Sequence, residues 1–168
     1  MALPYACPTL QNISIEKIME LIKPLPKTIF KRTTYAAAGI TRRTYRFGGK
    51  RVVCCSDRSV VDPIMNLLQL ATEAHPDSAS IRNLNLGHCT ISIYGVGQYV
   101  PVHKDQEAIH KHFDILSISF GAAATMMLGG KPVNLEHGCA ILFNGKVPHS
   151  TMPLEGVQRV NFTFRSWH

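Results

Sequence analysis

The sequence predicts a mainly β fold with flanking helices, built as one domain over residues 1–168. Short runs rich in β-branched and aromatic residues follow one another after Pro76, and Gly-containing turns separate them. Such a pattern is typical of an antiparallel sandwich or barrel. Amphipathic helical patterns lie before Pro76, and 168 residues suffice for one domain that buries a core without disulfides or structural metals.

Two short amphipathic helices are predicted in the N-terminal half, over residues 14–22 and from Asp62 to about His75. Apolar residues recur in both at spacings of three and four, which places them on one helix face. Ser14 suits the N-cap of the first helix and Asp62 that of the second, where Pro63 suits the first helical position. The segment between the helices predicts short strands and loops.

Six strands are predicted in the C-terminal half, where apolar and β-branched residues cluster between turns. Their predicted ranges are 89–94, 99–103, 115–120, 125–128, 139–143 and 159–165. A sheet that is apolar on one face must bury that face against another element. The two N-terminal helices are therefore expected to cover one face of the sheet.

The net charge of +7 is concentrated in residues 23–51, which hold nine of the 18 Lys and Arg residues and no Asp or Glu. Such a block attracts a polyanion, because binding releases the counterions condensed on phosphates. Phe30, Tyr35, Tyr45 and Phe47 are interleaved with these charges, and aromatic faces beside Arg suit unstacked bases. A solvated basic face that keeps the protein soluble is the alternative, but ordinary surfaces mix both signs. The composition therefore predicts contact with nucleic acid.

The cysteines argue against a disulfide framework and against a zinc knuckle. Their number, 5, is odd, Cys54 and Cys55 are adjacent, and no CxxC motif occurs. We therefore expect free, mostly buried thiols in a reducing cytosol. No apolar run approaches the roughly 18 residues of a membrane span, and the N-terminus lacks the basic and apolar regions of a signal peptide. These features predict a cytoplasmic protein without a membrane partner, and no obligatory protein partner is evident.

Three residues are candidates for a metal centre. In His103-Lys104-Asp105, a strand-like run would place His103 and Asp105 on one face, because alternate strand residues point the same way. His149 is the best candidate for a third ligand. Two His and one carboxylate form the facial triad of non-haem Fe(II) oxygenases, which leaves positions open for a cosubstrate and O2. An isolated H-x-D motif is more often a surface pair or a buried histidine with a partner, so this motif needs support from elsewhere.

The last predicted strand supplies that support. Residues 159–165 alternate polar and apolar at every position, so that Arg159, Asn161, Thr163 and Arg165 share one face. Two guanidiniums on one face could hold both carboxylates of a dicarboxylic acid, because Arg grips carboxylate through paired donors. 2-Oxoglutarate is such an acid: its keto-acid end can chelate iron, while its far carboxylate needs an Arg.

With these motifs, the sequence resembles the AlkB family of nucleic-acid dioxygenases. Residues 159–165 are similar to that family's R-x-N-x-T-x-R signature, and His103-Lys104-Asp105 and His149 are similar to its metal-binding motifs. The resembling segments occur in the family's order, at residues 41–48, 93–97, 103–107, 115–121, 148–149 and 159–165.

The resemblance implies a double-stranded β-helix (jelly-roll) core over residues 88–168. Residues 1–87 would form a helical and basic region that supports the core and provides a nucleotide-recognition lid. The short chain also resembles AlkB domains embedded in the replicase polyproteins of plant RNA viruses, which implies a host-cytoplasmic location.

The resemblance also implies roles for individual residues. His103, Asp105 and His149 would bind Fe(II), with 2-oxoglutarate and O2 as cosubstrates. The residues implied to bind 2-oxoglutarate are Arg159 at one carboxylate, Arg165 near the other carboxylate and the metal, Asn161, Tyr94 and Ser92. The residues implied to contact the substrate are Arg43, Tyr45, Arg46, Phe47 and Glu107. Ser92 stands where the family commonly has Asn, and serine is shorter and lacks the amide donor. A direct bond from this position to the cosubstrate is therefore not carried over, and a water is a candidate bridge.

The implied activity is oxidative demethylation of N-methylated bases in RNA or single-stranded DNA, with release of formaldehyde, succinate and CO2. A target base in a duplex would have to be flipped out of the stack. Two alternatives stay open, because a fold does not fix a function. One is a 2-oxoglutarate oxygenase that acts on a protein or a small molecule. The other is a non-catalytic nucleic-acid-binding module.

Overall fold

The computed structural model describes residues 2–25, 30–35, 40–47, 57–84, 86–105 and 114–166. Its helices are α1 (Pro8–Gln11), α2 (Ile15–Ile22), α3 (Arg58–Ala74) and α4 (Ser78–Arg82). Its strands are β1 (Tyr5–Ala6), β2 (Phe30–Tyr35), β3 (Ile40–Phe47), β4 (Leu86–Gly95), β5 (Asp114–Gly121), β6 (Ala124–Leu128), β7 (Lys131–Leu135), β8 (Cys139–Asn144), β9 (His149–Thr151) and β10 (Gln158–Ser166). Mostly β structure with few helices agrees with the predicted fold class.

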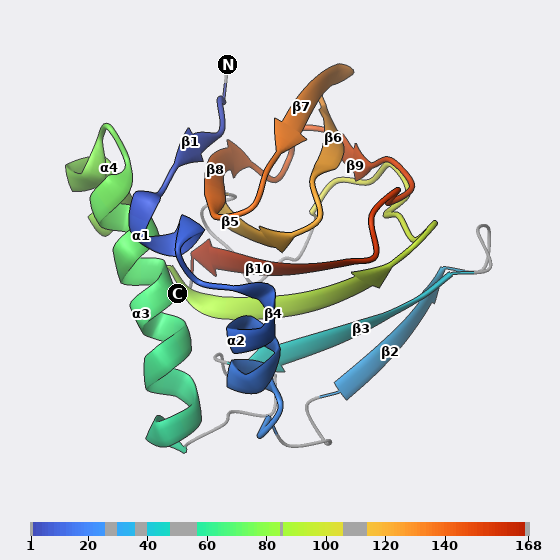
Figure 1. The fold of residues 1–168 in the computed structure, drawn as a ribbon. Coiled ribbons are helices and arrows are strands. Elements are labelled where there is room, and N and C mark those ends of the chain that lie inside the picture. Colours follow the sequence, from blue (N-terminus) through green and yellow to red (C-terminus); the bar gives the residue numbers. More distant parts are fainter. Residues whose placement is uncertain are drawn as a thin grey trace.

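The strands form two antiparallel sheets that face each other. The large sheet has the order β1-β8-β5-β10-β4-β3-β2 and the small sheet the order β7-β6-β9. The strand β10 lies between β4 and β5 and pairs with both along nearly its whole length. An isolated bridge between His103 and His149 adds one more segment beside the small sheet. The last strand of the chain is therefore central to the large sheet (Figure 1).

The helices cover the face of the large sheet that points away from the small sheet, as predicted (Figure 1). Ile18 of α2 and Ile64 of α3 pack in one buried cluster with Phe162 of β10. A second cluster lies between the two sheets and includes Met126 and Phe143. Because β10 alternates, its apolar side chains enter the helix-covered core and its polar side chains face the space between the sheets.

The first predicted helix is confirmed, while the start of the second was predicted too late. Ser14 caps α2, since its hydroxyl accepts a hydrogen bond from the Lys17 amide at 3.3 Å. The helix α3 begins at Arg58, because Asp57 accepts from the Ser59 amide at 2.9 Å and so provides an earlier cap than Asp62. Pro63 therefore lies inside α3.

The strand pattern differs from the prediction in four places, one of which is β1, a strand of 2 residues that was not predicted. Residues 99–103 form no strand; this segment has only the single bridge at His103. The strands β7 and β9 were not predicted. The first begins Lys131-Pro132 at a sheet edge, and the second has 3 residues, too few to show a period of two.

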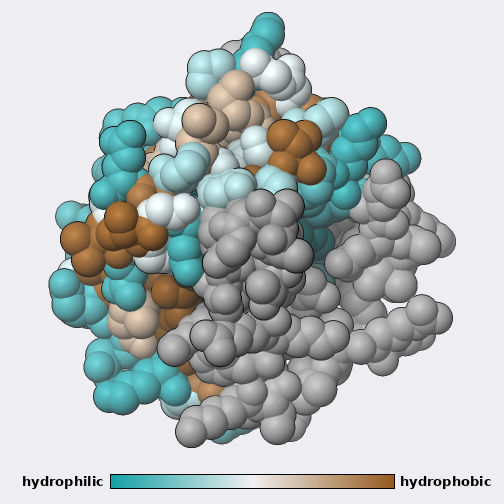
Figure 2. Space-filling view, turned by 90° about the vertical axis from the view of Figure 1, so that its right-hand side faces the viewer, coloured by the Kyte–Doolittle hydropathy of each residue, from teal (hydrophilic) through white to brown (hydrophobic). Residues whose placement is uncertain are grey.

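On the face drawn in Figure 2, the coloured residues include both hydrophilic areas and separate apolar patches. Among the described residues, no helix is long and apolar enough to cross a membrane.

Cys7, Cys89 and Cys139 are free and buried, as expected for unpaired thiols. The other two cysteines lie outside the described residues.

Two glycines that share a left-handed backbone allow a matched test of this packing. Gly121 has φ +88°, and a Cβ there would lie 2.4 Å from the Gln158 carbonyl oxygen, whereas Gly130 has φ +79° with nothing within 4 Å. We expect Gly130→Ala to cost about 1 kcal/mol from backbone strain alone. Gly121→Ala should cost about 3 kcal/mol, because the β5–β10 contact must also shift. Urea unfolding measures both, and equal losses would contradict the packing described for this end of β10.

Candidate active site

A cavity of about 80 Å³ lies between the two sheets. One wall is polar and comes from β4, β5 and β10, with Thr90, Ser117 and Asn161 among its residues. Apolar side chains complete the lining, among them Met126 of the small sheet and Phe143 of β8 in the large sheet. One water needs roughly 10–15 Å³, so the cavity has room for a small polar molecule. The polar side chains of β10 that were predicted to share one face all line it.

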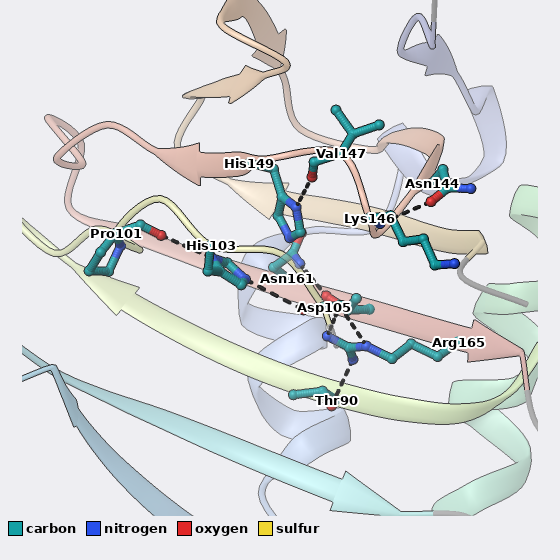
Figure 3. Close-up of polar contacts among 11 residues, drawn as sticks. Thr90, Pro101, His103, Asp105, Asn144, Lys146, Val147, His149, Asn161 and Arg165 are labelled. Carbon is teal, nitrogen blue, oxygen red and sulfur yellow. Dashed lines mark hydrogen bonds and ion pairs between the residues drawn. The ribbon is translucent and has the colours of Figure 1, made fainter. Parts of the chain in front are cut away.

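The structure brings together the three predicted metal ligands. One ligand atom each of His103, Asp105 and His149 lies within 4.8 Å of the others. Paired backbone hydrogen bonds of 3.0 and 2.9 Å join His103 to His149, and the Asp105 amide donates to the Gly145 carbonyl at 2.9 Å. The three ligands therefore sit on two neighbouring backbone segments that hold each other in place (Figure 3).

Both histidines are oriented by a backbone carbonyl two residues earlier in the chain. Nδ1 of His103 lies 2.9 Å from the Pro101 oxygen, and Nδ1 of His149 lies 2.8 Å from the Val147 oxygen. In each ring Nδ1 therefore carries the proton and donates it, which leaves the lone pair of Nε2 for a metal. Burial lowers the pKa of His149, which favours the neutral ring that a metal requires.

Asp105 is held by Arg165, which reaches it from β10. Nε and Nη2 of Arg165 lie 3.0 and 2.9 Å from Oδ2 of Asp105, and Nη1 donates to the Thr90 hydroxyl at 3.2 Å. Burial by itself would raise the pKa of Asp105, but the neighbouring His103 ring, whose Nε2 lies 3.5 Å from Oδ1, and the Arg165 charge hold that pKa well below its usual range. The carboxylate is therefore charged and available to a cation at neutral pH.

Arg159 lies at the other end of the polar wall and is only 2% exposed. Its Nη2 donates to the Ser119 hydroxyl at 2.8 Å and to the Asn161 side-chain oxygen at 3.1 Å, and its guanidinium lies 5.3 Å from the ring centre of Tyr94. Within the described chain, Nε has no hydrogen-bond partner and no carboxylate pairs with this guanidinium. Burial lowers the pKa of Arg159, since the charged form is desolvated. A buried cation with an unused donor is a place for an anion.

Asn161 organises the polar wall around Arg159. Its side-chain oxygen accepts from the hydroxyls of Ser117 and Ser119 at 3.0 and 3.3 Å, and its amide donates to Thr163 at 2.8 Å. Neither serine was singled out from the sequence. Their alternation with Ile118 indicates only a shared strand face; the pairing of β5 with β10 is what places that face beside Asn161.

The remaining predicted residues are placed by strand register. Tyr94 pairs with Arg159 and Ser92 with Asn161, and both are buried. On β3, position 46 pairs with Thr90, which lines the cavity.

The other three predicted positions on β3 do not pair with residues of β4 that line the cavity. Arg43, Tyr45 and Phe47 pair with residues 93, 91 and 89, which alternate with the cavity-lining positions of β4. These three positions therefore belong to the opposite face of the sheet. Glu107 lies outside the described residues. The roles in substrate binding, and the lid itself, stay predictions.

Comparison with known proteins identifies relatives of this chain. A family model described as the 2OG-Fe(II) oxygenase superfamily matches residues 19–165. The fold is similar to an oxidoreductase of the 2OG-Fe(II) oxygenase family from Burkholderia pseudomallei, with a TM-score of 0.63 and 17% identity over 89% of this chain and 76% of that one. It is also similar to a predicted oxalate decarboxylase from Thermotoga maritima, with a TM-score of 0.50 and 10% identity over 83% of this chain and 94% of that one. Comparison with curated protein sequences gives no match. The structural likeness confirms the predicted jelly-roll core.

The metal centre is testable without turnover. We expect the protein to bind one equivalent of Mn(II), a redox-stable substitute for Fe(II). Asp105→Ala and His149→Ala should each weaken binding by more than about 100-fold, because residues that merely orient a ligand already contribute 10–100-fold. Electron paramagnetic resonance of the free ion measures the affinity. His75→Ala is the control, since that ring packs on Tyr5. Equal affinities in all four proteins would rule out this site.

Proposed function

The chain belongs to the 2OG-Fe(II) oxygenase superfamily, and within it we propose that the chain removes N-methyl groups from bases of RNA or single-stranded DNA, as AlkB-type enzymes do. Members of the superfamily are dioxygenases that use Fe(II), 2-oxoglutarate and O2. Two questions decide the proposal: whether the site fits these groups, and whether the surroundings favour a nucleic acid.

The residues fit Fe(II). Two neutral imidazoles and one carboxylate are the donor set of the facial triad, and His103, His149 and Asp105 supply it from one end of the cavity. The Nδ1–H bonds to backbone carbonyls fix both rings, and Arg165 keeps Asp105 ionised. These contacts orient the ligands before any metal binds.

The residues also fit 2-oxoglutarate. The Arg159 guanidinium would hold the far carboxylate, since it is buried, has no carboxylate partner in the described chain and has an unused Nε–H. Ser119 and Asn161 orient it through Nη2. Arg165 lies at the metal end and still has one spare N–H on each Nη. The apolar side chains of Met126 and Phe143, which also line the cavity, would help to exclude water from it.

The bound groups would supply the oxidation, in which the methyl carbon leaves as formaldehyde, N–H replaces N–CH3, O2 is consumed and 2-oxoglutarate gives succinate and CO2. The protein binds and orients the reactants and shields them from water. A base in a duplex must first leave the stack.

A single observation carries the choice of nucleic acid as substrate. The strand β3, from the acid-free basic segment 23–51, hydrogen-bonds to β4, and positions 44 and 46 pair with the cavity residues Ser92 and Thr90. The most basic part of the chain therefore extends the same sheet that forms the polar wall of the cavity. This proximity supports a substrate that carries phosphates next to the reacting group.

The direct test uses matched single-stranded RNA and DNA that contain 1-methyladenine or 3-methylcytosine. We expect loss of the methyl group, with formaldehyde and succinate formed in equal amounts, measured by mass spectrometry and coupled assays. Asp105→Ala should lose at least about 1,000-fold in rate, since the metal site is incomplete. Succinate formation that no methylated oligonucleotide stimulates would favour a protein or small-molecule substrate. Failure to bind Fe(II) or Mn(II) would favour a non-catalytic binding module.

A further inference from the structure

Thr90 of β4 is a buried residue of the polar wall, and among the described residues its side chain hydrogen-bonds only to Arg165. Its hydroxyl accepts from Nη1 of Arg165 at 3.2 Å (Figure 3). In the sheet, Thr90 pairs with Thr163 of β10 on one side and with position 46 of β3 on the other. A central strand therefore presents this hydroxyl to the arginine that holds the metal ligand Asp105.

The contact between Arg165 and Asp105 fixes where the carboxylate lies but not how it is turned. Nε and Nη2 of Arg165 both reach the same oxygen, Oδ2, at 3.0 and 2.9 Å. A paired contact to both carboxylate oxygens is geometrically specific, whereas two bonds that meet at one oxygen let the groups pivot about it. Such a pivot would move the other oxygen, Oδ1, which lies 3.5 Å from Nε2 of His103.

The hydroxyl of Thr90 removes this freedom. The guanidinium is planar, so a contact on a second edge of the plane fixes its rotation. Nη1 makes that contact with Thr90, while Nε and Nη2 hold Asp105. Oδ1 of Asp105 then stays directed at Nε2 of His103, the ring nitrogen that is left for a metal. The ligand atoms of the triad thereby remain within 4.8 Å of one another.

A separate set of hydrogen bonds orients the cosubstrate end of the wall. Asn161 donates to the Thr163 hydroxyl at 2.8 Å, and its side-chain oxygen accepts from Nη2 of Arg159 at 3.1 Å. Within the described part of the chain, no hydrogen bond joins this set to the one that contains Thr90 and Arg165. The two sets meet where Thr90 and Thr163 lie opposite each other in the register of β4 and β10.

We propose that Thr90 is a positioning residue for the metal centre, which acts through Arg165 to hold Asp105 in the orientation that binds Fe(II). Thr163 belongs to the other set and acts, through Asn161 and Arg159, on the far carboxylate of 2-oxoglutarate. Two threonines that lie side by side on one wall therefore serve different ligands. This inference uses the Fe(II) and 2-oxoglutarate of the superfamily and does not depend on which substrate is oxidised.

The test measures two affinities in variants of Thr90. Electron paramagnetic resonance gives Kd for Mn(II) without 2-oxoglutarate, and calorimetry gives Kd for 2-oxoglutarate at saturating Mn(II). Thr90→Val replaces the hydroxyl by a methyl group and should weaken Mn(II) binding about tenfold, since residues that orient a ligand contribute 10–100-fold. Its affinity for 2-oxoglutarate should stay within about twofold of the wild type, as expected for changes that share no partner. Thr90→Ala removes the same acceptor and should behave like the Val variant.

Two further variants separate the hydroxyl from general damage to the wall. Thr90→Ser keeps the acceptor and should bind Mn(II) like the wild type. Thr163→Val is the matched control from the neighbouring strand. It should leave the Mn(II) affinity unchanged and weaken 2-oxoglutarate binding about fivefold, as expected for the loss of one hydrogen bond between neutral groups. Circular dichroism checks that each variant is folded.

Wild-type Mn(II) affinity in Thr90→Val and Thr90→Ala would overturn the role of Thr90. The same holds if Thr90→Ser binds Mn(II) as weakly as these variants, because the hydroxyl would then not matter. Equal losses of Mn(II) and 2-oxoglutarate affinity in Thr90→Val, or weakened Mn(II) binding in Thr163→Val, would contradict the separation of the two sets. These are binding measurements, so a failure to demethylate any oligonucleotide would overturn the proposed function and leave the role of Thr90 intact.

Discussion

The ion pair between Arg165 and Asp105 connects the two parts on which the site depends. Asp105 lies in a segment that is tied by backbone hydrogen bonds to the loop before His149. Arg165 lies on β10, the central strand that β4 and β5 hold on both sides. Because the guanidinium reaches the carboxylate at 2.9 Å, the metal ligands are fixed relative to the wall that contains Arg159. Asp105, which lies outside any strand, is thereby held by a residue of the central strand.

Because polar and apolar residues alternate along β10, one face of this strand builds the hydrophobic core and the other face lines the cavity. Phe162 and Phe164 fill the helix-covered core, whereas Arg159 and Asn161 occupy a buried polar wall. Burying Arg159 without a carboxylate partner costs stability in the ligand-free protein. An anion that binds there recovers this cost, so cosubstrate binding and folding stability should be linked. The helix-covered face supplies the hydrophobic burial that lets the other face remain polar.

The sequence was most informative where a chemical pattern and strand periodicity coincide. The alternating residues 159–165 predicted the polar wall, which the structure shows on β10. His103, Asp105 and His149 cluster as their residue types predicted, although residues 99–103 form no strand and periodicity did not place them. The sequence was least informative where short-range hydrogen bonds decide the structure. Asp57, and not Asp62, is the N-cap of α3. The strand β9 has too few residues to show alternation.

The register between paired strands shows which residues share a face of the sheet, and the spacing of residues along the sequence does not show this. The resemblance implies substrate contacts at Arg43, Tyr45, Arg46 and Phe47, yet pairing with β4 assigns position 46 and the other three positions to opposite faces of the sheet. Ser117 and Ser119 become part of the site only because β5 pairs with β10. Such cross-strand neighbours depend on the tertiary pairing of distant segments, which no local pattern in a single chain specifies.

The central claim is that one cavity holds a metal on His103, Asp105 and His149 and an anion on Arg159. Calorimetric titration of 2-oxoglutarate into metal-free and Mn(II)-loaded protein tests it most directly, with Arg159→Met measured in parallel. We predict one equivalent bound, at least about 100-fold more tightly with the metal present. The Met variant should lose about 100-fold of that affinity, as expected for charge-assisted hydrogen bonds of about 1.5–3 kcal/mol each. Equal binding with and without Mn(II), or a Met variant that binds like the wild type, would contradict the claim.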